Sequence, residues 1–307
     1  MLGLSATARH APLDRWLGGA AALVLLTFDV DAVTPVLAAG KEYESHLSTM
    51  SHQAYGPKVG LPRILAMLER RRLPATFFFP GLTAERWPGT VELVLEAGHE
   101  VALHGYTHRT PTALSEGEQL EELERGMAAL RRCGARPAGY RAPLWSTTAV
   151  TLEALGAHGL RYDSSLFDDD RPYLLDTPSG RLAELPVHWS LDDWEQYVYV
   201  PEPDLGHTIS RPSIVAQLWS EELDAMRGTA SLCVLTCHPF VSGRPSRLAA
   251  IERFIDFAEV CGDVAFGRAG ELADRLLAIP DGDLLGQRPP EHQGLQGRGG
   301  SRDVGPG

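Results

Sequence analysis

The feature of this sequence that most constrains its fold is an alternation of short apolar runs with amphipathic stretches, repeated about seven times. The apolar runs predict strands at residues 22–28, 75–79, 100–103, 159–163, 182–187, 232–237 and 263–266. A strand followed by a helix, repeated in this way, predicts a parallel sheet covered by helices. With this many units, a closed or nearly closed barrel is favoured over an open sheet.

The stretches between the runs have the spacing of surface helices. Apolar residues recur with a 3.6-residue period, as Leu61, Ile64 and Leu68 do, which places them on one helix face. Ser115 and Glu118 form the pattern of a capping box. We expect helices over residues 61–72, 115–132, 214–226 and 248–260.

Composition and charge exclude several classes of protein. The chain has 307 residues, and its formal charge of −12 argues against a nucleic-acid partner. Four cysteines are too few for a disulfide scaffold in a chain of this length. The apolar run 16–28 is shorter than the roughly 20 residues of a membrane-spanning helix and ends in two aspartates. We therefore expect no membrane segment, no cleaved leader and a cytoplasmic location.

The ends of the chain differ from its middle. Residues 281–307 are rich in Gly, Pro, Gln and Arg and have almost no apolar pattern, which predicts a disordered tail. We expect residues 1–15 to form a loosely ordered arm. Neither a repeat nor an interdomain linker interrupts residues 16–280, so we assign them to a single barrel domain.

Polar side chains that can act in catalysis or metal binding follow the predicted strands. They are Asp29 and Asp31, His104 and His108, Arg141, and His238. In barrels of this kind the active residues lie at the carboxyl ends of the strands, so we expect these side chains to gather at one face. If His104 and His108 begin a helix, their four-residue spacing puts both imidazoles on the same side. A carboxylate from another strand would complete a two-His, one-Asp site for a divalent cation.

Five motifs in this order resemble those of the polysaccharide deacetylases of carbohydrate esterase family 4. They lie at residues 27–31 (TFDVD), 104–108 (HGYTH), 141–144 (RAPL), 189–194 (WSLDDW) and 235–239 (LTCHP). The first has one residue inserted relative to the family's T-F-D-D, and glycine replaces the hydroxyl residue of the second, H-[ST]-x-x-H. The separated D-V-D, with segments 51–65 and 162–173, resembles the allantoinase-like and peptidoglycan-deacetylase-like branch.

The resemblance implies a distorted (β/α) barrel of about seven strands and a single metal ion. Asp31, His104 and His108 would hold the ion, with Zn²⁺ expected and Co²⁺, Mn²⁺ or Ni²⁺ as alternatives. Asp29 would be the general base that activates water, and Arg141 would keep it ionised and oriented. The resemblance also suggests a homo-oligomer such as a tetramer.

His238 would be the general acid that protonates the leaving nitrogen. Asp192 or Asp193 would be its partner, and we favour Asp192 because its spacing from Trp189 matches the family. The backbone N–H of Tyr106 could complete an oxyanion site. Candidate substrate-binding residues are Tyr55, Tyr106, Trp145, Asp169 and Trp194.

Three functions are consistent with these residues. The first is a metal-dependent hydrolase that removes an N-acyl group from an amino sugar. The second uses the same groups to open a cyclic imide or ureide, and a cytoplasmic location favours this small-molecule substrate. The third is a barrel that binds a metal without turnover, which is disfavoured because a base, an acid and an orienting arginine are all present.

Overall fold

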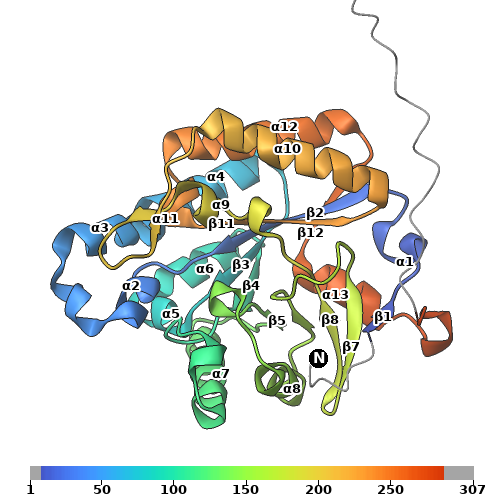
Figure 1. Cartoon of the computed structure of the whole chain (residues 1–307), viewed down its shortest axis with the longest axis horizontal. Coiled ribbons are helices and arrows are strands. Elements are labelled where there is room, and N and C mark those ends of the chain that lie inside the picture. Colours follow the sequence, from blue (N-terminus) through green and yellow to red (C-terminus); the bar gives the residue numbers. More distant parts are fainter. Residues whose placement is uncertain (1–7, 287–307) are drawn as a thin grey trace, which may run out of the picture.

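In a computed structural model, which describes residues 8–286, a curled sheet forms the centre of the molecule (Figure 1). Its strands are β1 (Ala8–His10), β2 (Ala22–Asp29), β3 (Thr76–Phe79), β4 (Glu100–Leu103), β5 (Gly139–Tyr140), β6 (Tyr162–Asp163), β7 (Tyr173–Thr177), β8 (Gly180–Glu184), β11 (Leu232–Cys237) and β12 (Val264–Gly267). They pair in the order β1-β7-β8-β6-β5-β4-β3-β2-β11, and β12 also pairs with β2. A separate hairpin joins β9 (Tyr199–Val200) and β10 (Gly206–His207).

The part of the sheet from β8 to β11 is parallel throughout, whereas β1 and β7 pair in antiparallel fashion at one end. The hydrogen-bonded path stays open between β8 and β11. The chain that leaves β8 nevertheless reaches β11, because Asp192 forms a parallel bridge with Thr236. The fold is thus a distorted, nearly closed (β/α) barrel with seven parallel strands on its main path, as the sequence predicts.

Helices pack against both faces of this sheet, most of them on the outside. The helices of at least eight residues are α3 (Leu47–Tyr55), α4 (Leu61–Arg71), α6 (Pro88–Glu96), α7 (Glu116–Arg132), α8 (Ala149–Ala157), α10 (Pro212–Thr229), α12 (Pro245–Cys261) and α13 (Ala269–Leu277). The shorter ones are α1 (Leu13–Leu17), α2 (Thr34–Ala39), α5 (Gly81–Arg86), α9 (Asp193–Tyr197) and α11 (Pro239–Ser242). Short 3-10 helices lie at η1 (Lys41–Ser45), η3 (Pro111–Ala113), η4 (Pro143–Trp145), η5 (Trp189–Leu191) and η6 (Asp281–Asp283), and a π-helix lies at η2 (Gly56–Gly60). No described helix is long and apolar enough to cross a membrane.

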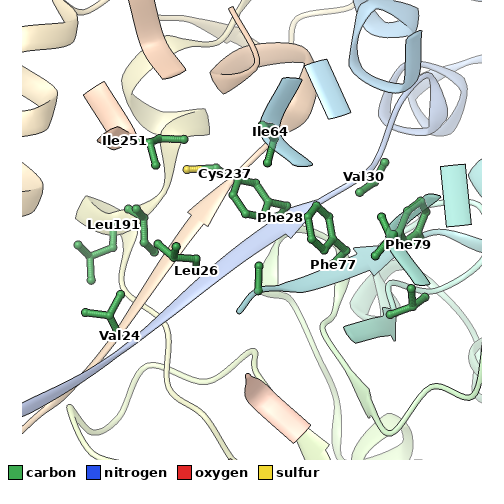
Figure 2. Close-up of a cluster of buried hydrophobic side chains, with 14 of the residues drawn as sticks. Val24, Leu26, Phe28, Val30, Ile64, Phe77, Phe79, Leu191, Cys237 and Ile251 are labelled. Carbon is green, nitrogen blue, oxygen red and sulfur yellow. The ribbon is translucent and has the colours of Figure 1, made fainter. Parts of the chain in front are cut away.

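The strand β2 separates two layers of the core. Successive side chains of a strand point to opposite faces, so Val24, Leu26 and Phe28 face the covering helices together with Val30 (Figure 2). There they pack in one buried cluster with side chains from α4, α12 and β3. Leu23 and Leu25 belong to the second buried cluster, inside the curled sheet. The inward-facing positions that follow them are Thr27 and Asp29. The inner face of the strand is therefore polar at its carboxyl end.

Both edges of β2 are paired along their length. One edge pairs with β11 over residues 23–28. The other edge is shared: residues 22–25 pair with β12, and residues 27–29 pair with β3. The strand is therefore buried on every side, which explains why its sequence is an unbroken apolar run up to Thr27.

The described parts of the two terminal segments, residues 8–15 and 281–286, are more ordered than the sequence predicts. Residues 8–10 form β1 against β7, and residues 13–17 form α1, so the expectation of a loose arm over 1–15 is wrong for this part. The expectation of a disordered tail from residue 281 is wrong for residues 281–286, which include η6 and in which Leu285 exchanges two backbone hydrogen bonds with His10. Residues 1–7 and 287–307 lie outside the described residues.

Candidate active site

The candidate side chains meet at the carboxyl ends of four parallel strands of the same sheet. Asp29 ends β2, His104 follows β4, Arg141 follows β5, and His238 follows β11. Asp31, two residues beyond Asp29, is buried with them. Of these, Asp29, Asp31, His104 and His238 line a cavity of about 210 Å³ together with His108, whereas Arg141 is buried behind it. The strand-end rule of parallel barrels brings together the residues that it selected from the sequence.

Asp31, His104 and His108 have the arrangement of a metal-ligand set. Oδ1 of Asp31 lies 3.5 Å from Nε2 of His104, and Oδ2 lies 3.3 Å from Nε2 of His108. Both Asp31 oxygens are buried and have no hydrogen-bond partner among the described residues. Burial alone would raise the pKa of Asp31, but the facing His108, His104 and His238 hold it well below its usual range. Two imidazoles and one ionised carboxylate fit a divalent ion such as Zn²⁺ and leave coordination positions open.

Hydrogen bonding orients the His104 ring for this role. Its Nδ1 lies 2.7 Å from the backbone oxygen of Arg141, and because a carbonyl only accepts, Nδ1 carries the hydrogen. Nε2 is then free to present its lone pair toward Asp31. Burial lowers the pKa of His104 despite the nearby Asp29 and Asp31, which favours the neutral imidazole that a metal requires.

The two histidines lie on a loop and not at a helix start, which corrects the geometry expected from their spacing. Gly105 and His108 adopt left-handed backbone conformations, with φ of 71° and 67°, and the two imidazole rings come within 5.0 Å. Glu122 on α7 holds the loop by accepting hydrogen bonds from the backbone N–H groups of Tyr106 and Thr107. Because the Tyr106 N–H is used in this way, it cannot serve as the expected oxyanion donor.

Asp29 is paired with Arg141, as expected. Nη1 of Arg141 donates to Oδ1 of Asp29 over 2.8 Å and to Oγ1 of Thr27 over 3.0 Å. The guanidinium carbon lies 4.1 Å from the ring centroid of Phe78, and its remaining nitrogens donate to Ser164. Arg141 is fully buried, so these contacts fix the position and orientation of the Asp29 carboxylate.

His238 is paired with Asp193, whereas the sequence favoured Asp192. Nδ1 of His238 lies 2.7 Å from Oδ1 of Asp193 but 3.6 Å from Asp192. Asp193 also accepts hydrogen bonds from the His238 backbone N–H and from Ser242. Burial alone would lower the pKa of His238, but the charges of Asp193, Asp192 and Asp31 raise it to about 10. Burial raises the pKa of Asp192 to about 8, and its side chain caps α9 through the Trp194 N–H.

The proposed substrate-binding residues divide into two groups. Trp145 and Trp194 line the cavity, with the Trp194 ring 5.0 Å from that of His238. Tyr55, Tyr106 and Asp169 lie elsewhere: Tyr55 contacts Arg63 and Gly243, Tyr106 bonds to Glu85, and Asp169 accepts from the Arg171 backbone. A hollow of about 390 Å³ adjoins the cavity and shares His108, Leu144 and Trp194 with it.

Sequence reasoning missed the residues that support Arg141. Ser165 accepts a hydrogen bond from the Ala142 backbone and donates to Asp163, and Glu184 accepts from the backbone of Ser165. Burial raises the pKa of Asp163 to about 6 and that of Glu184 well above its usual range. Asp163 ends β6, so the strand-end rule could have selected this group.

Comparison with known proteins agrees with the fold. Residues 21–162 match the sequence profile of the polysaccharide deacetylases. A Mycobacterium smegmatis structure described as a polysaccharide deacetylase is 44% identical, with 85% of this chain and 91% of that chain covered and a TM-score of 0.81. A peptidoglycan deacetylase of Helicobacter pylori is 29% identical over 83% of this chain and 96% of its own. The structure of the Puue allantoinase is 23% identical, with coverage of 88% and 95% and a TM-score of 0.77, and shares the fold.

The barrel and its relatives define a hydrolase of carbon–nitrogen bonds other than peptide bonds. The chain belongs to the polysaccharide deacetylase family. The peptidoglycan-deacetylase-like branch expected from the motifs is supported as well.

Proposed function

We propose that the protein is a metal-dependent N-deacetylase that removes the acetyl group from an N-acetylated amino sugar of a polysaccharide or its oligomers. One observation carries this proposal. Asp31, His104 and His108, which would hold the cation, lie beside two separately partnered groups, Asp29 with Arg141 and His238 with Asp193. Cation site, base and acid within one cavity are the parts that amide hydrolysis needs.

A divalent ion at Asp31, His104 and His108 would supply Lewis acidity toward the acyl carbonyl and toward water. The chain's own residues move the protons. The Asp29 carboxylate accepts a proton from the attacking water, while Arg141 keeps the second Asp29 oxygen engaged. His238 donates its Nδ1–H to Asp193, and because its pKa is raised to about 10 against the effect of burial it also holds a proton on Nε2, which it donates to the nitrogen as the C–N bond breaks. The products are a carboxylate and a free amine.

A second candidate is the opening of a small cyclic imide or ureide by the same groups. The observation that favours it is the size of the cavity, because about 210 Å³ can enclose a five-membered ring. Both reactions break an amide C–N bond, so the machinery alone does not separate them.

A hydrolysis screen tests the proposal. The protein is loaded with Zn²⁺, Co²⁺, Mn²⁺ or Ni²⁺ and incubated with N-acetylglucosamine oligomers, succinimide, hydantoin or allantoin. We expect acetate release from the oligomers. Ring opening without acetate release would overturn the deacetylase assignment, and no turnover with any substrate would support the non-catalytic barrel.

Three finer points belong to the same proposal. The ion is Zn²⁺, because two imidazoles and a carboxylate match its preferred donors. The enzyme is a homo-oligomer in the cytoplasm. Elemental analysis of the purified protein, sedimentation and cell fractionation test these points, and a different resident metal, a monomer or a wall-associated enzyme would correct them.

A further inference from the structure

Exposed aromatic side chains are rare on this protein and are not scattered. Of the described residues, Phe167, Trp189 and Tyr199 are the aromatic side chains left exposed, at 44%, 46% and 48%. Phe167 and Trp189 come from different loops yet stack on each other, with ring centroids 5.1 Å apart and planes inclined by 27°. Two exposed aromatic rings that stack in this way form a patch, and such patches mark binding surfaces.

The patch continues into the active site. The buried Trp145 ring lies 4.6 Å from Trp189 and 5.5 Å from Phe167. Trp145 and Trp189 both line the cavity that contains Asp31 and His238. Leu144, which is 57% exposed, lines the same cavity. We call Leu144, Trp145, Phe167 and Trp189 the aromatic platform, and it leads from the catalytic groups to the protein surface.

Hydrogen bonds hold the platform in place. The loop of Phe167 is fixed on one side by the Leu166 N–H, which donates to Glu184, and by the Leu166 carbonyl, which accepts from Val187. The turn of Trp189 is fixed by Ser190, whose hydroxyl donates to Glu222. A platform that is already formed loses little conformational entropy when a ligand lies on it.

The cavity is too small to hold a whole oligosaccharide. A volume of 210 Å³ corresponds to about seven water molecules, below the usual range of ligand pockets. It can hold an acylamino group and part of one sugar ring. The rest of an oligosaccharide must lie outside, and the platform is the apolar surface that begins at the cavity wall.

We propose that the aromatic platform is a subsite for the pyranose next to the one that is deacetylated, which rests on the proposed function. A pyranose presents axial C–H groups on one face, and these stack on exposed indole and phenyl rings. The rings carry no charge, so the platform fits a neutral sugar. Binding energy gained there, away from the reacting amide, serves to hold the amide against Asp29 and His238. The enzyme therefore favours an oligomer over a single N-acetyl sugar or a small cyclic imide.

Kinetics on substrates of increasing length test the platform. With the metal-loaded protein, kcat/KM is measured for N-acetylglucosamine and its tetramer. We expect Trp189→Ala and Phe167→Ala to lower the tetramer-to-monomer ratio of kcat/KM by about tenfold, as the loss of one stacking contact does. Tyr199→Ala removes an equally exposed ring from the β9–β10 hairpin and serves as the matched control. Unchanged ratios in two folded platform variants would overturn the proposal.

Ligand binding separates this proposal from the proposed function. Tryptophan fluorescence of the wild-type protein is titrated with the tetramer, and we expect a saturable change that Trp189→Ala abolishes. Saturable binding without hydrolysis would support the platform and refute the deacetylase activity. Hydrolysis with the same kcat/KM for monomer and tetramer would do the reverse. If the platform variants change only the sedimentation coefficient, the patch is a contact between copies of the chain and the subsite is refuted.

Discussion

The two faces of β2 have opposite characters although their residues alternate in one strand. The outer face carries Phe28 and its apolar neighbours, which pack under the helices (Figure 2). The inner face changes from leucine at its start to Thr27 and then Asp29, with Asp31 beyond it. One strand thus supplies stability on one side and carries the proposed base on the other, with the proposed metal ligand two residues beyond its end. This separation predicts that substitutions of adjacent residues will have different kinds of effect.

The largest effect is expected at Asp29. Asp29→Asn keeps the shape of the side chain and an oxygen for Arg141, but it cannot accept a proton from water. We expect kcat/KM to fall by about 10³-fold, the scale of a lost general base. Metal content, measured by elemental analysis, should be unchanged, since Asp29 is outside the ligand set. Loss of metal would mean that Asp29 and Asp31 have exchanged roles, and His104→Ala, which should lower metal content, is the positive control.

The adjacent residue on the outer face should behave in the opposite way. Phe28 is buried and stacks on Phe77 with centroids 4.9 Å apart. We expect Phe28→Ala to lower the free energy of unfolding by about 3 kcal/mol, because it leaves a cavity in the core. Urea denaturation measures this, and Phe28→Leu should lose much less. If folded Phe28→Ala loses as much activity as Asp29→Asn, the two faces are not functionally separate.

A third prediction concerns the cost of polar groups inside the barrel. The pKa of Asp163 is raised from 3.8 to about 6 by burial, so its contribution to stability is present below about pH 4 and is lost as the pH rises through 6. As the pH rises from 4 to 7, we expect Asp163→Asn to gain stability relative to wild type. The gain in unfolding free energy should be on the order of 1–2 kcal/mol. Urea denaturation at several pH values measures it. Asp204→Asn, on an exposed turn, is the control, and an equal trend there would contradict the assignment.

The smallest effect is expected at Thr27, where the inner face changes from apolar to ionic. Thr27→Val keeps the shape but removes one hydrogen bond to Arg141 and one to Leu235, each 3.0 Å long. A loss of about 1 kcal/mol corresponds to about fivefold in kcat/KM. Thr151→Val removes a buried hydrogen bond to Gln119 far from the site and should affect stability alone. Equal kinetic effects in both variants would show that Arg141 does not depend on Thr27.

How well the sequence predicts each strand depends on how strong a pattern burial leaves in it. Unbroken apolar runs identified β2, β4 and β11 to within one residue, because a strand buried on both faces leaves a strong pattern. The sequence predicts neither the two-residue strand β5 nor the antiparallel strand β7, because β5 is too short to show a pattern and only residues 173–175 of β7 are buried. The strand-end rule found the residues of the site because it depends only on topology.

Side-chain direction at the site could not be predicted from residue type. Asp192 and Asp193 are adjacent acids, and only the local backbone assigns their roles. Asp192 has extended torsion angles and turns its carboxylate to the first turn of α9, which leaves Asp193 to face His238. The path of the loop from His104 to His108 likewise depends on Glu122, which lies in a helix among several similar acids.

The pairing of β2 also determines when the site can form during synthesis. One edge of the strand can pair with β3 soon after both leave the ribosome, whereas Leu235 lies 208 residues after Thr27. At typical elongation rates, this separation corresponds to roughly 10–40 s. For that time the strand bearing Asp29 has an unpaired edge, a surface on which nascent chains aggregate and chaperones act. Active enzyme therefore appears only after β11 has been translated.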